Sequence, residues 1–324
     1  MLKLLEVLAQ TLTEGHDCLL ATVIESSGST PRSVGAYMLV GSQGRIYGTI
    51  GGGNLEYQAI LKGQKQIAQR ENFLFEYVLT AEKVAGLGMI CGGSCKVLFC
   101  YLNAADAAVR QSVEQALAAA KMQEPYWLLL PFDAGPLKVV DNVEVRGRAG
   151  KLLTTDGKEY YAEQFAYDGK VYIFGGGHLA QEVVPLLAHL DFTCVVIDDR
   201  EEFSRAELFP GAAEVLQLDF KQLSEHLNLQ QSDYAAVMTR GHLHDADVER
   251  FLLNTDTGYI GVVGSRRKAQ LTRETLLAEG YSRQHLDRII TPIGLDIGSE
   301  TPAEISVSIA AQLIQERAAR YNKA

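Results

Sequence analysis

The sequence has few cysteines, and their number does not suggest a disulfide framework. Five occur among 324 residues, and three of them lie close together at Cys91, Cys95 and Cys100. A small, odd number in a chain of this length is typical of a reducing compartment. Cys91 and Cys95 also lack a second pair of ligands, which argues against a structural zinc site.

Long apolar runs and net positive charge are also scarce. No apolar run approaches the ~20 residues of a membrane-spanning helix, and the leucines near the N-terminus have the spacing of an amphipathic helix rather than of a secretory signal. The chain carries 40 acidic and 30 basic residues, a net charge of -10, which disfavours nucleic acid or an anionic membrane as a partner. We therefore expect a cytoplasmic protein that binds neither.

The chain is long enough for two domains, and 47% of its residues are hydrophobic. Residues 1–132 have the pattern of an α+β domain. Residues 133–168 are rich in Gly, Asp and Lys and are expected to connect the domains. From residue 169 to 324 strands alternate with helices, which predicts an α/β, Rossmann-like domain with a doubly wound parallel sheet.

A glycine-rich turn stands at the start of the second domain. Gly175, Gly177 and Ala180 match G-x-G-x-x-A between a predicted strand and a predicted helix, a pattern that brings ligand phosphates to the helix N-terminus. Asp198 closes the next strand, where a carboxylate can accept from a ribose hydroxyl. The turn, with Gly176 and His178, could instead only pack helix on sheet, leaving Asp198 a strand-end residue and His178 solvated.

Two later strand ends carry unusual residues. Ser265 is a good N-cap, and Arg266, Arg267 and Lys268 follow it in the first helical turn, where the helix dipole disfavours cations. They indicate an anionic ligand, or else an exposed basic turn. Residues 240–245 (RGHLHD) resemble a metal-ligand set, although no further ligand is evident and Asp245 is more simply an N-cap.

Three loops of the first domain are candidate sites. Gly51, Gly52 and Gly53 precede a predicted helix and could offer backbone N–H groups to an oxyanion, although no Gly-Lys-Ser/Thr follows them. Arg32 could supply a bidentate charge, and Glu56 could merely cap its own helix. The alternative is a set of ordinary tight turns. Cys91, next to Gly92 and Gly93, is an accessible thiol that could act as nucleophile, sulfur carrier or soft metal ligand, or be buried and inert.

Six ordered segments resemble the xanthine dehydrogenase accessory protein (XdhC/CoxI) family. They are GSTPRSVGAYMLV, GTIGGGNLE, MICGGSCKVLF, VYIFGGGHLAQ with VVIDDREEF, YIGVVGSRRK, and PIGLDIGSETPAEISVSI. The resemblance covers nearly the whole chain, although residues 104–168 contribute little. The family's motif positions correspond here to Ser29, Thr30, Arg32, Gly51, Gly52, Gly53, Glu56, Cys91, Gly92, Gly93, Gly175, Gly176, Gly177, Asp198, Arg200, Gly264, Ser265, Arg266 and Arg267.

The resemblance implies a maturation factor that carries the molybdenum cofactor (molybdopterin) and need not be an enzyme. Such proteins bind the cofactor while its terminal sulfur is installed and pass it to a xanthine dehydrogenase-type molybdenum hydroxylase. A homodimer and a cysteine desulfurase partner are also implied. We hypothesise that the cofactor lies between the domains, with Cys91 near molybdenum and Gly175 to Gly177 near the phosphate. The main rival is an NAD(P)-dependent oxidoreductase, for which no general acid is evident.

Overall fold

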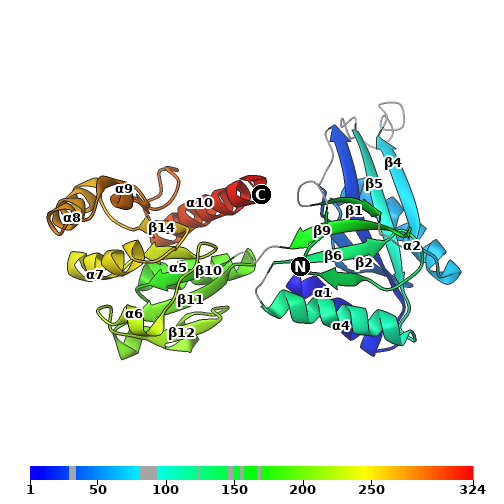
Figure 1. Ribbon diagram of the computed structural model, residues 1–324, viewed down its shortest axis with the longest axis horizontal. Coiled ribbons are helices and arrows are strands. Elements are labelled where there is room, and N and C mark those ends of the chain that lie inside the picture. The colour runs from blue at the N-terminus through cyan, green and yellow to red at the C-terminus, as the bar shows by residue number, and fades with distance from the viewer. Residues whose placement is uncertain are drawn as a thin grey trace. The chain divides into compact units, whose positions relative to one another are not determined.

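The structure is a computed structural model that describes residues 1–28, 34–79, 93–122, 125–144, 149–153, 157–165 and 169–323 (Figure 1). The chain divides into two compact units, Met1–Tyr167 and Asp168–Ala324. Each unit has its own hydrophobic core. None of the helices in the described part of the chain is long and apolar enough to cross a membrane.

Unit 1 is built on a five-stranded antiparallel sheet of order β3-β2-β1-β5-β4. Its strands are β1 (Cys18–Gly28), β2 (Tyr37–Gly41), β3 (Gly44–Gly48), β4 (Phe73–Leu79) and β5 (Gly93–Leu102). Successive side chains of β1 point to opposite faces, so Leu19 and Leu20 enter two different cores. The sheet is therefore buried on both sides.

Helices cover the two faces of this sheet. The helices α1 (Leu2–Thr13) and α4 (Ala107–Met122) lie side by side in Figure 1 and pack with Leu20 and Leu98. The helix α2 (Gly53–Gln66), continued by the short 3-10 helix η1 (Ile67–Gln69), packs with Leu19 on the other face. The α+β interpretation of the first unit agrees with this arrangement.

Most of residues 133–168, which were expected to connect the domains, group with the first unit and contain three strands. The strands β6 (Tyr126–Pro131), β7 (Lys138–Val140), β8 (Ala149–Leu153) and β9 (Glu159–Phe165) form a four-stranded antiparallel sheet of order β7-β6-β9-β8. Leu128 and Tyr161 from this sheet join the core beneath α1. The strands are short and interrupted by turn residues, so their pairing with β6 is not visible from local pattern.

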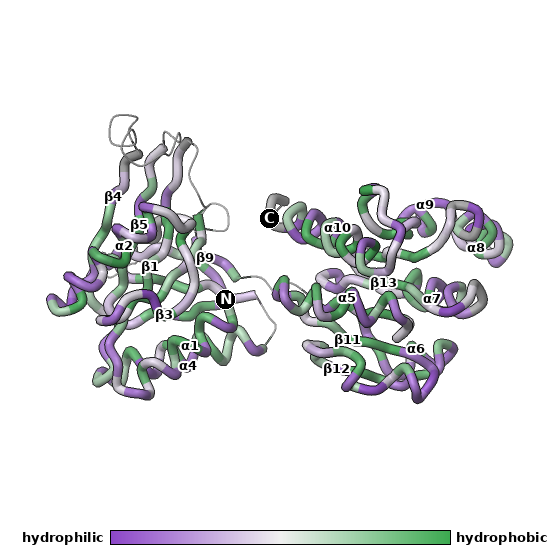
Figure 2. The backbone as a smooth tube through the Cα atoms, turned by 180° about the vertical axis from the view of Figure 1, so that it is seen from behind, coloured by the Kyte–Doolittle hydropathy of each residue, from purple (hydrophilic) through white to green (hydrophobic). Residues whose placement is uncertain are grey.

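Unit 2 is a Rossmann-like domain with a six-stranded parallel sheet of order β12-β11-β10-β13-β14-β15. The strands are β10 (Lys170–Phe174), β11 (Thr193–Asp198), β12 (Glu214–Gln217), β13 (Tyr234–Val237), β14 (Tyr259–Val262) and β15 (Ile289–Ile290). Figure 2 colours the central strands largely as hydrophobic, as expected for a sheet covered on both faces.

Helices lie on both faces of the parallel sheet. The helices α5 (His178–His189) and α10 (Pro302–Lys323) pack together over one face, with Val183 and Ile309 in the same core. The helices α6 (Leu223–His226) and α7 (His242–Leu253) cover the other, next to α8 (Arg266–Ala278) and α9 (Arg283–Leu286). Two short 3-10 helices, η2 (Glu201–Phe203) and η3 (Ala206–Leu208), follow β11.

Candidate functional site

The parallel sheet of unit 2 brings the predicted loops to one edge. β10 has β11 on one side and β13 on the other, so the direction in which strands are added reverses next to β10. Ligands of open α/β sheets bind outside the carboxyl ends of the strands at such a point. Gly175 follows β10, Asp198 ends β11, Arg240 follows β13, and Gly264 follows β14 at this edge.

Two glycines of the turn are required by packing. Gly175 has a φ of 110°, and a Cβ there would stand 2.5 Å from the carbonyl oxygen of Met238. A Cβ at Gly176 would stand 2.1 Å from the carbonyl oxygen of Phe203. The segments after β13 and β11 therefore close over these two positions, and both glycines are buried.

Gly177 differs from its neighbours because the space beside it is open. It is the N-cap of α5, and apart from its two chain neighbours no described residue has an atom within 4 Å of where its Cβ would stand. His178 follows and is exposed. The part of the turn that can receive a ligand is thus Gly177 with the first turn of α5, where N–H groups and the helix dipole favour an anion.

Asp198 has a structural role that the ribose interpretation overlooked. Its side chain is 2% exposed, and its oxygens accept hydrogen bonds from Gly176 N at 2.8 Å, from Arg200 N at 3.0 Å, and from the Arg200 guanidinium at 2.9 and 3.0 Å. Burial alone would raise the pKa of Asp198, but these bonds and the charge of Arg200 bring it below its usual value. We therefore assign Asp198 to holding the turn, and its contact with a ribose hydroxyl stays a prediction.

Arg200 is held in place as firmly as its partner. Its guanidinium stacks 3.8 Å from the centre of the Phe203 ring. Asp199 lies 3.7 Å from Arg200 and 3.3 Å from Arg240. Arg240 is half exposed at 51% and is therefore the cation better placed to meet a ligand at this edge. Its position directly after a buried strand is the sequence signal that could have singled it out.

The side chain of His242, one member of the possible metal-ligand set in the same loop, lies outside the described part of the structure. The described residues contain no group of three His, Cys, Asp or Glu side chains placed for a metal ion. Asp245 accepts a hydrogen bond from the Thr239 hydroxyl, and the His244 ring packs edge-on against Phe220 at 5.7 Å. Both residues are occupied in fixing the start of α7.

The basic turn after β14 lies at the surface. Ser265 and Arg267 are exposed at the start of α8, and the side chains of Arg266 and Lys268 lie outside the described part of the structure. Arg267 lines a hollow of about 370 Å³ together with Gln270, Leu271 and Glu274.

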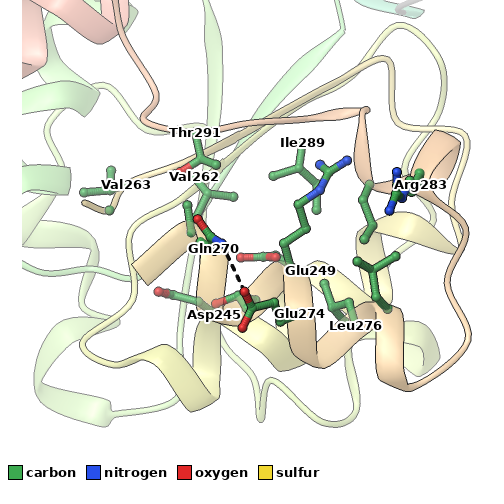
Figure 3. A pocket seen from close by; sticks show the side chains of 16 residues that line it. Asp245, Glu249, Val262, Val263, Gln270, Glu274, Leu276, Arg283, Ile289 and Thr291 are labelled. Atoms are coloured by element: carbon green, nitrogen blue, oxygen red, sulfur yellow. Dashed lines mark hydrogen bonds between the residues drawn. The ribbon is translucent and has the colours of Figure 1, made fainter. Parts of the chain in front are cut away.

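A larger cavity of about 500 Å³ adjoins this turn (Figure 3), and the sequence did not predict it. It lies among α7, α8, α9, β14 and β15, with Gly264 in its lining. Glu249, 5% exposed, contributes a buried carboxylate to it. The signal available from sequence was the placement of Glu249 four residues after Asp245, on the apolar face of α7 that also carries Val248 and Leu252.

The glycines of the first unit do not offer a free cradle of N–H groups. Gly51, Gly52 and Gly53 have positive φ values of 126°, 72° and 60°. Gly51 N donates to the Thr49 hydroxyl at 3.2 Å and Gly52 N donates to Glu56 at 3.1 Å. Two of the three N–H groups expected to face an oxyanion are therefore used within the loop in this structure, and their binding role stays a prediction.

Glu56 is the centre of this loop. Besides Gly52 N, it accepts from Ile50 N at 3.1 Å, from the Thr49 hydroxyl at 2.5 Å and from Arg45 at 3.0 Å. Burial acts to raise the pKa of Glu56, but the bonds from Thr49, Gly52 and Ile50 and the charge of Arg45 lower it overall. The alternative that Glu56 caps its own helix describes its contacts well.

Other predicted residues of the first unit lie outside the described part of the structure, namely Ser29, Thr30, Arg32, Cys91 and Gly92. Gly93 begins β5 and pairs with Gly28 at the end of β1. The four described cysteines are all buried, and burial raises the pKa of Cys18 and of Cys194 to about 12. It also raises the pKa of Cys95 and Cys100. None of these four thiols is suited to act as a thiolate near neutral pH.

The fold defines a class, a two-unit α/β protein whose second unit is a Rossmann domain. Residues 171–313 match a family model described as the XdhC Rossmann domain, and residues 11–78 match one described as the XdhC and CoxI family. The chain belongs to the XdhC family of xanthine dehydrogenase accessory factors.

Similar proteins are known over nearly the full chain. A Bacillus subtilis (strain 168) protein, named as a probable subunit of xanthine dehydrogenase, is 25% identical over 320 residues, 94% of this chain and 95% of that protein. A crystal structure from Bacillus halodurans, described as a xanthine dehydrogenase, has a TM-score of 0.81 and 25% identity and covers 98% of this chain and 96% of that one. The uncharacterized protein YqeB of Escherichia coli (strain K12) is 25% identical over 297 residues, 91% of this chain but only 43% of its own length.

Proposed function

We propose that this protein is a maturation factor that carries molybdenum cofactor to a xanthine dehydrogenase-type molybdenum hydroxylase. It binds the cofactor as cargo, supports installation of the terminal sulfur, and supports insertion into the target enzyme. Family membership supports the type of target. The observation that carries the binding role is the open N-terminus of α5 at Gly177.

The anionic end of the cofactor suits this edge of the sheet. Molybdopterin ends in a phosphate, and a helix N-terminus supplies N–H donors together with a favourable dipole. Arg240 stands at the end of the neighbouring strand with half of its side chain exposed. An exposed site of this kind binds an anion with moderate strength because water screens the charges. Moderate strength suits a carrier that must release its cargo.

The sulfur-rich, soft end of the cofactor calls for a thiolate. The four described thiols are buried with raised pKa values, so we assign this role to Cys91. Replacing Cys91 by Ala is expected to lower both the cofactor retained on purification and the activation of the target enzyme. Cys95→Ala, a neighbouring buried thiol, is the matched control and is expected to change neither. Undiminished retention and activation with Cys91→Ala would remove Cys91 from the proposal.

The site at Gly177 is tested by filling it. Gly177→Leu places a side chain in open space, so the fold is expected to tolerate it while the approach of a phosphate is blocked. The variant is expected to keep its melting temperature and to retain several-fold less cofactor. His189→Leu, at an exposed position at the other end of α5, is the control for added apolar surface. Equal retention in wild type and Gly177→Leu would place the phosphate elsewhere.

The oxidoreductase remains the second candidate because the domain is of the Rossmann type. Asp198, the residue that would accept from a ribose hydroxyl, is committed to Gly176 and Arg200. We therefore expect weak binding of NADH and NADPH and no turnover. Fluorescence titration of the purified protein tests this, and tight binding accompanied by turnover would favour the enzyme.

A carrier of this kind needs partners, and we propose three. They are the target hydroxylase, a cysteine desulfurase that supplies sulfur, and a second copy of this chain. Co-purification of tagged protein from cells that express each partner tests the first two. Light scattering of the isolated protein tests the homodimer, for which a monomer mass would be the contrary result.

A further inference from the structure

We propose that the cavity among α7, α8, α9, β14 and β15 binds a flat heterocycle through a 2-amino-4-oxo-pyrimidine edge. Pterins and guanine share this edge. The choice of a pterin as the expected source rests on the proposed function, since molybdenum cofactor contains a pterin. The chemistry of the cavity itself does not depend on that choice.

The size and walls of the cavity suit a small planar ligand. Its volume of about 500 Å³ lies within the ~300–1,000 Å³ range of small-molecule sites. Apolar side chains form much of its lining, and they come from β14, α8, α9 and β15 (Figure 3). These residues are Val262, Leu276, Leu277, Leu286 and Ile289. Apolar walls stabilise the faces of a ring while a few polar groups fix its orientation.

Glu249 supplies the acceptor for the donor edge. It is 5% exposed and lines the cavity from α7. The edge of the heterocycle carries a ring N–H beside an amino group, and the two oxygens of a carboxylate match these two donors. A carboxylate has about four acceptor sites, so Glu249 can keep a protein partner and still accept from a ligand. Asp245, one turn earlier, is engaged by the Thr239 hydroxyl.

The buried hydroxyl of Thr291 independently supports a ligand in this cavity. Its hydroxyl oxygen is buried, the residue lines the cavity, and the hydroxyl has no hydrogen-bond partner among the described residues. A buried hydroxyl without a partner is costly, and the oxo group of the ring is an acceptor that would satisfy it. The lining therefore offers the Glu249 carboxylate as an acceptor for the N–H groups of the ring, and the Thr291 hydroxyl as a donor for its oxo group.

Arginine side chains line the same cavity and the hollow next to it. Arg283 lines the cavity (Figure 3), and Arg273 is held by Asp287 at 2.5 Å. Planar guanidinium groups stack well on heterocycles. Arg267 lines the adjoining hollow, which shares Gln270 and Glu274 with the cavity.

The test uses the full-length protein and defined probes. We would follow the intrinsic fluorescence of 6-hydroxymethylpterin during titration, with the corresponding lumazine, which has an oxo group in place of the amino group, as the ligand control. GMP and AMP form a second pair. The pterin is expected to bind and the lumazine to bind at least several-fold more weakly, because it loses the amino donor to Glu249.

Matched variants locate the binding. Glu249→Gln removes one acceptor and the charge without changing shape, so pterin affinity is expected to fall about tenfold or more. Thr291→Val is expected to weaken binding less. Glu182→Gln is the control, because Glu182 is exposed on α5 and does not line the cavity. Thermal melting shows whether each variant is folded.

The outcomes distinguish a pterin from a guanine nucleotide as the ligand, and they distinguish failure of the cavity proposal from failure of the carrier role. Binding of GMP without pterin would assign the cavity to a guanine nucleotide, still through Glu249. No binding of either, or unchanged affinity in a folded Glu249→Gln variant, overturns the inference. If Glu249→Gln retains cofactor on purification as well as wild type, the assignment of the cavity to the pterin of the cofactor fails and the carrier role stands. If free pterin binds through Glu249 but no cofactor co-purifies, the carrier role fails and the cavity stands.

Discussion

Arg200 forms a two-point ion pair with Asp198, in which Nε and Nη2 donate to the two carboxylate oxygens at 2.9 and 3.0 Å. The same carboxylate accepts from the backbone N–H of Gly176 at 2.8 Å. The end of β11 is thereby tied to the glycine turn after β10. Asp198, which the sequence suggested as a ribose ligand, instead holds the shape of the turn that leaves Gly177 open.

Asp198→Asn is expected to destabilise unit 2 by about 3 kcal/mol, because it breaks a buried charge-assisted network and leaves Arg200 without its partner. Asp199→Asn is the control, since its contacts with Arg200 and Arg240 are longer and more exposed. A loss below about 1 kcal/mol is expected there. Chemical denaturation monitored by circular dichroism measures both. Equal losses in the two variants would contradict the assignment.

Acid is expected to weaken both units through Asp198 and Glu56. The folded-state pKa of each lies below its ordinary value, which is 3.8 for Asp198 and 4.5 for Glu56. Such groups contribute stability that is complete above the unfolded pKa and is lost as the pH falls through the folded pKa. Unfolding in urea at stepwise lower pH should therefore show a smaller acid loss in Glu56→Gln than in wild type. An unchanged pH dependence of stability in Glu56→Gln would show that Glu56 does not contribute to the loss of stability in acid.

Gly176→Ala is expected to lower the stability of unit 2 more than Gly177→Ala does, although the two residues are neighbours. The new Cβ at Gly176 meets a backbone oxygen at 2.1 Å, so the loop must shift, at an expected cost of about 1–3 kcal/mol. At Gly177 the φ of -69° suits alanine and the space is open, so a change within about 0.5 kcal/mol is expected. Thermal melting measures the pair, and a reversed order would refute this description of the turn.

Tyr37→Phe tests whether the strands of residues 138–165 belong to unit 1. The Tyr37 hydroxyl, at the start of β2, donates to Glu163 of β9 at 2.5 Å. Removing it is expected to destabilise the unit by about 1–2 kcal/mol, because the bond joins its two sheets and its acceptor is a carboxylate. Tyr47→Phe is the control, since Tyr47 is exposed. Equal free energies of unfolding for Tyr37→Phe and Tyr47→Phe would count against the contact between the two sheets of unit 1.

Much of the fold was predictable because its signals are local. The alternation of strands and helices from Val171 onward predicted the parallel sheet, which the structure has. Thr301 and Glu304 have the spacing of a helix-capping box before α10, and in the structure Glu304 accepts a hydrogen bond from Thr301 N at 2.9 Å. By contrast, β15 has only two residues and is recognisable through its pairing with β14.

The candidate site was only partly predictable because its character depends on packing. Gly175, Gly176 and Gly177 look alike in sequence, yet the chain around Met238 and Phe203 makes the first two structural and leaves the third open. Glu56 and Asp198 both appeared as candidate ligands, and their acceptor capacity is largely used by neighbouring N–H and hydroxyl groups. The cavity at Glu249 needs five elements to form, so no single motif could reveal it.

The pterin content of the purified protein shows whether this chain carries molybdenum cofactor. The protein would be purified anaerobically from a host that makes the cofactor and, as a control, from one that does not. Bound pterin is then released and quantified by fluorescence after oxidation. Near-stoichiometric pterin is expected in protein from the first host, and none in protein from the second. Absence of pterin from well-folded protein made in the first host would contradict the carrier role.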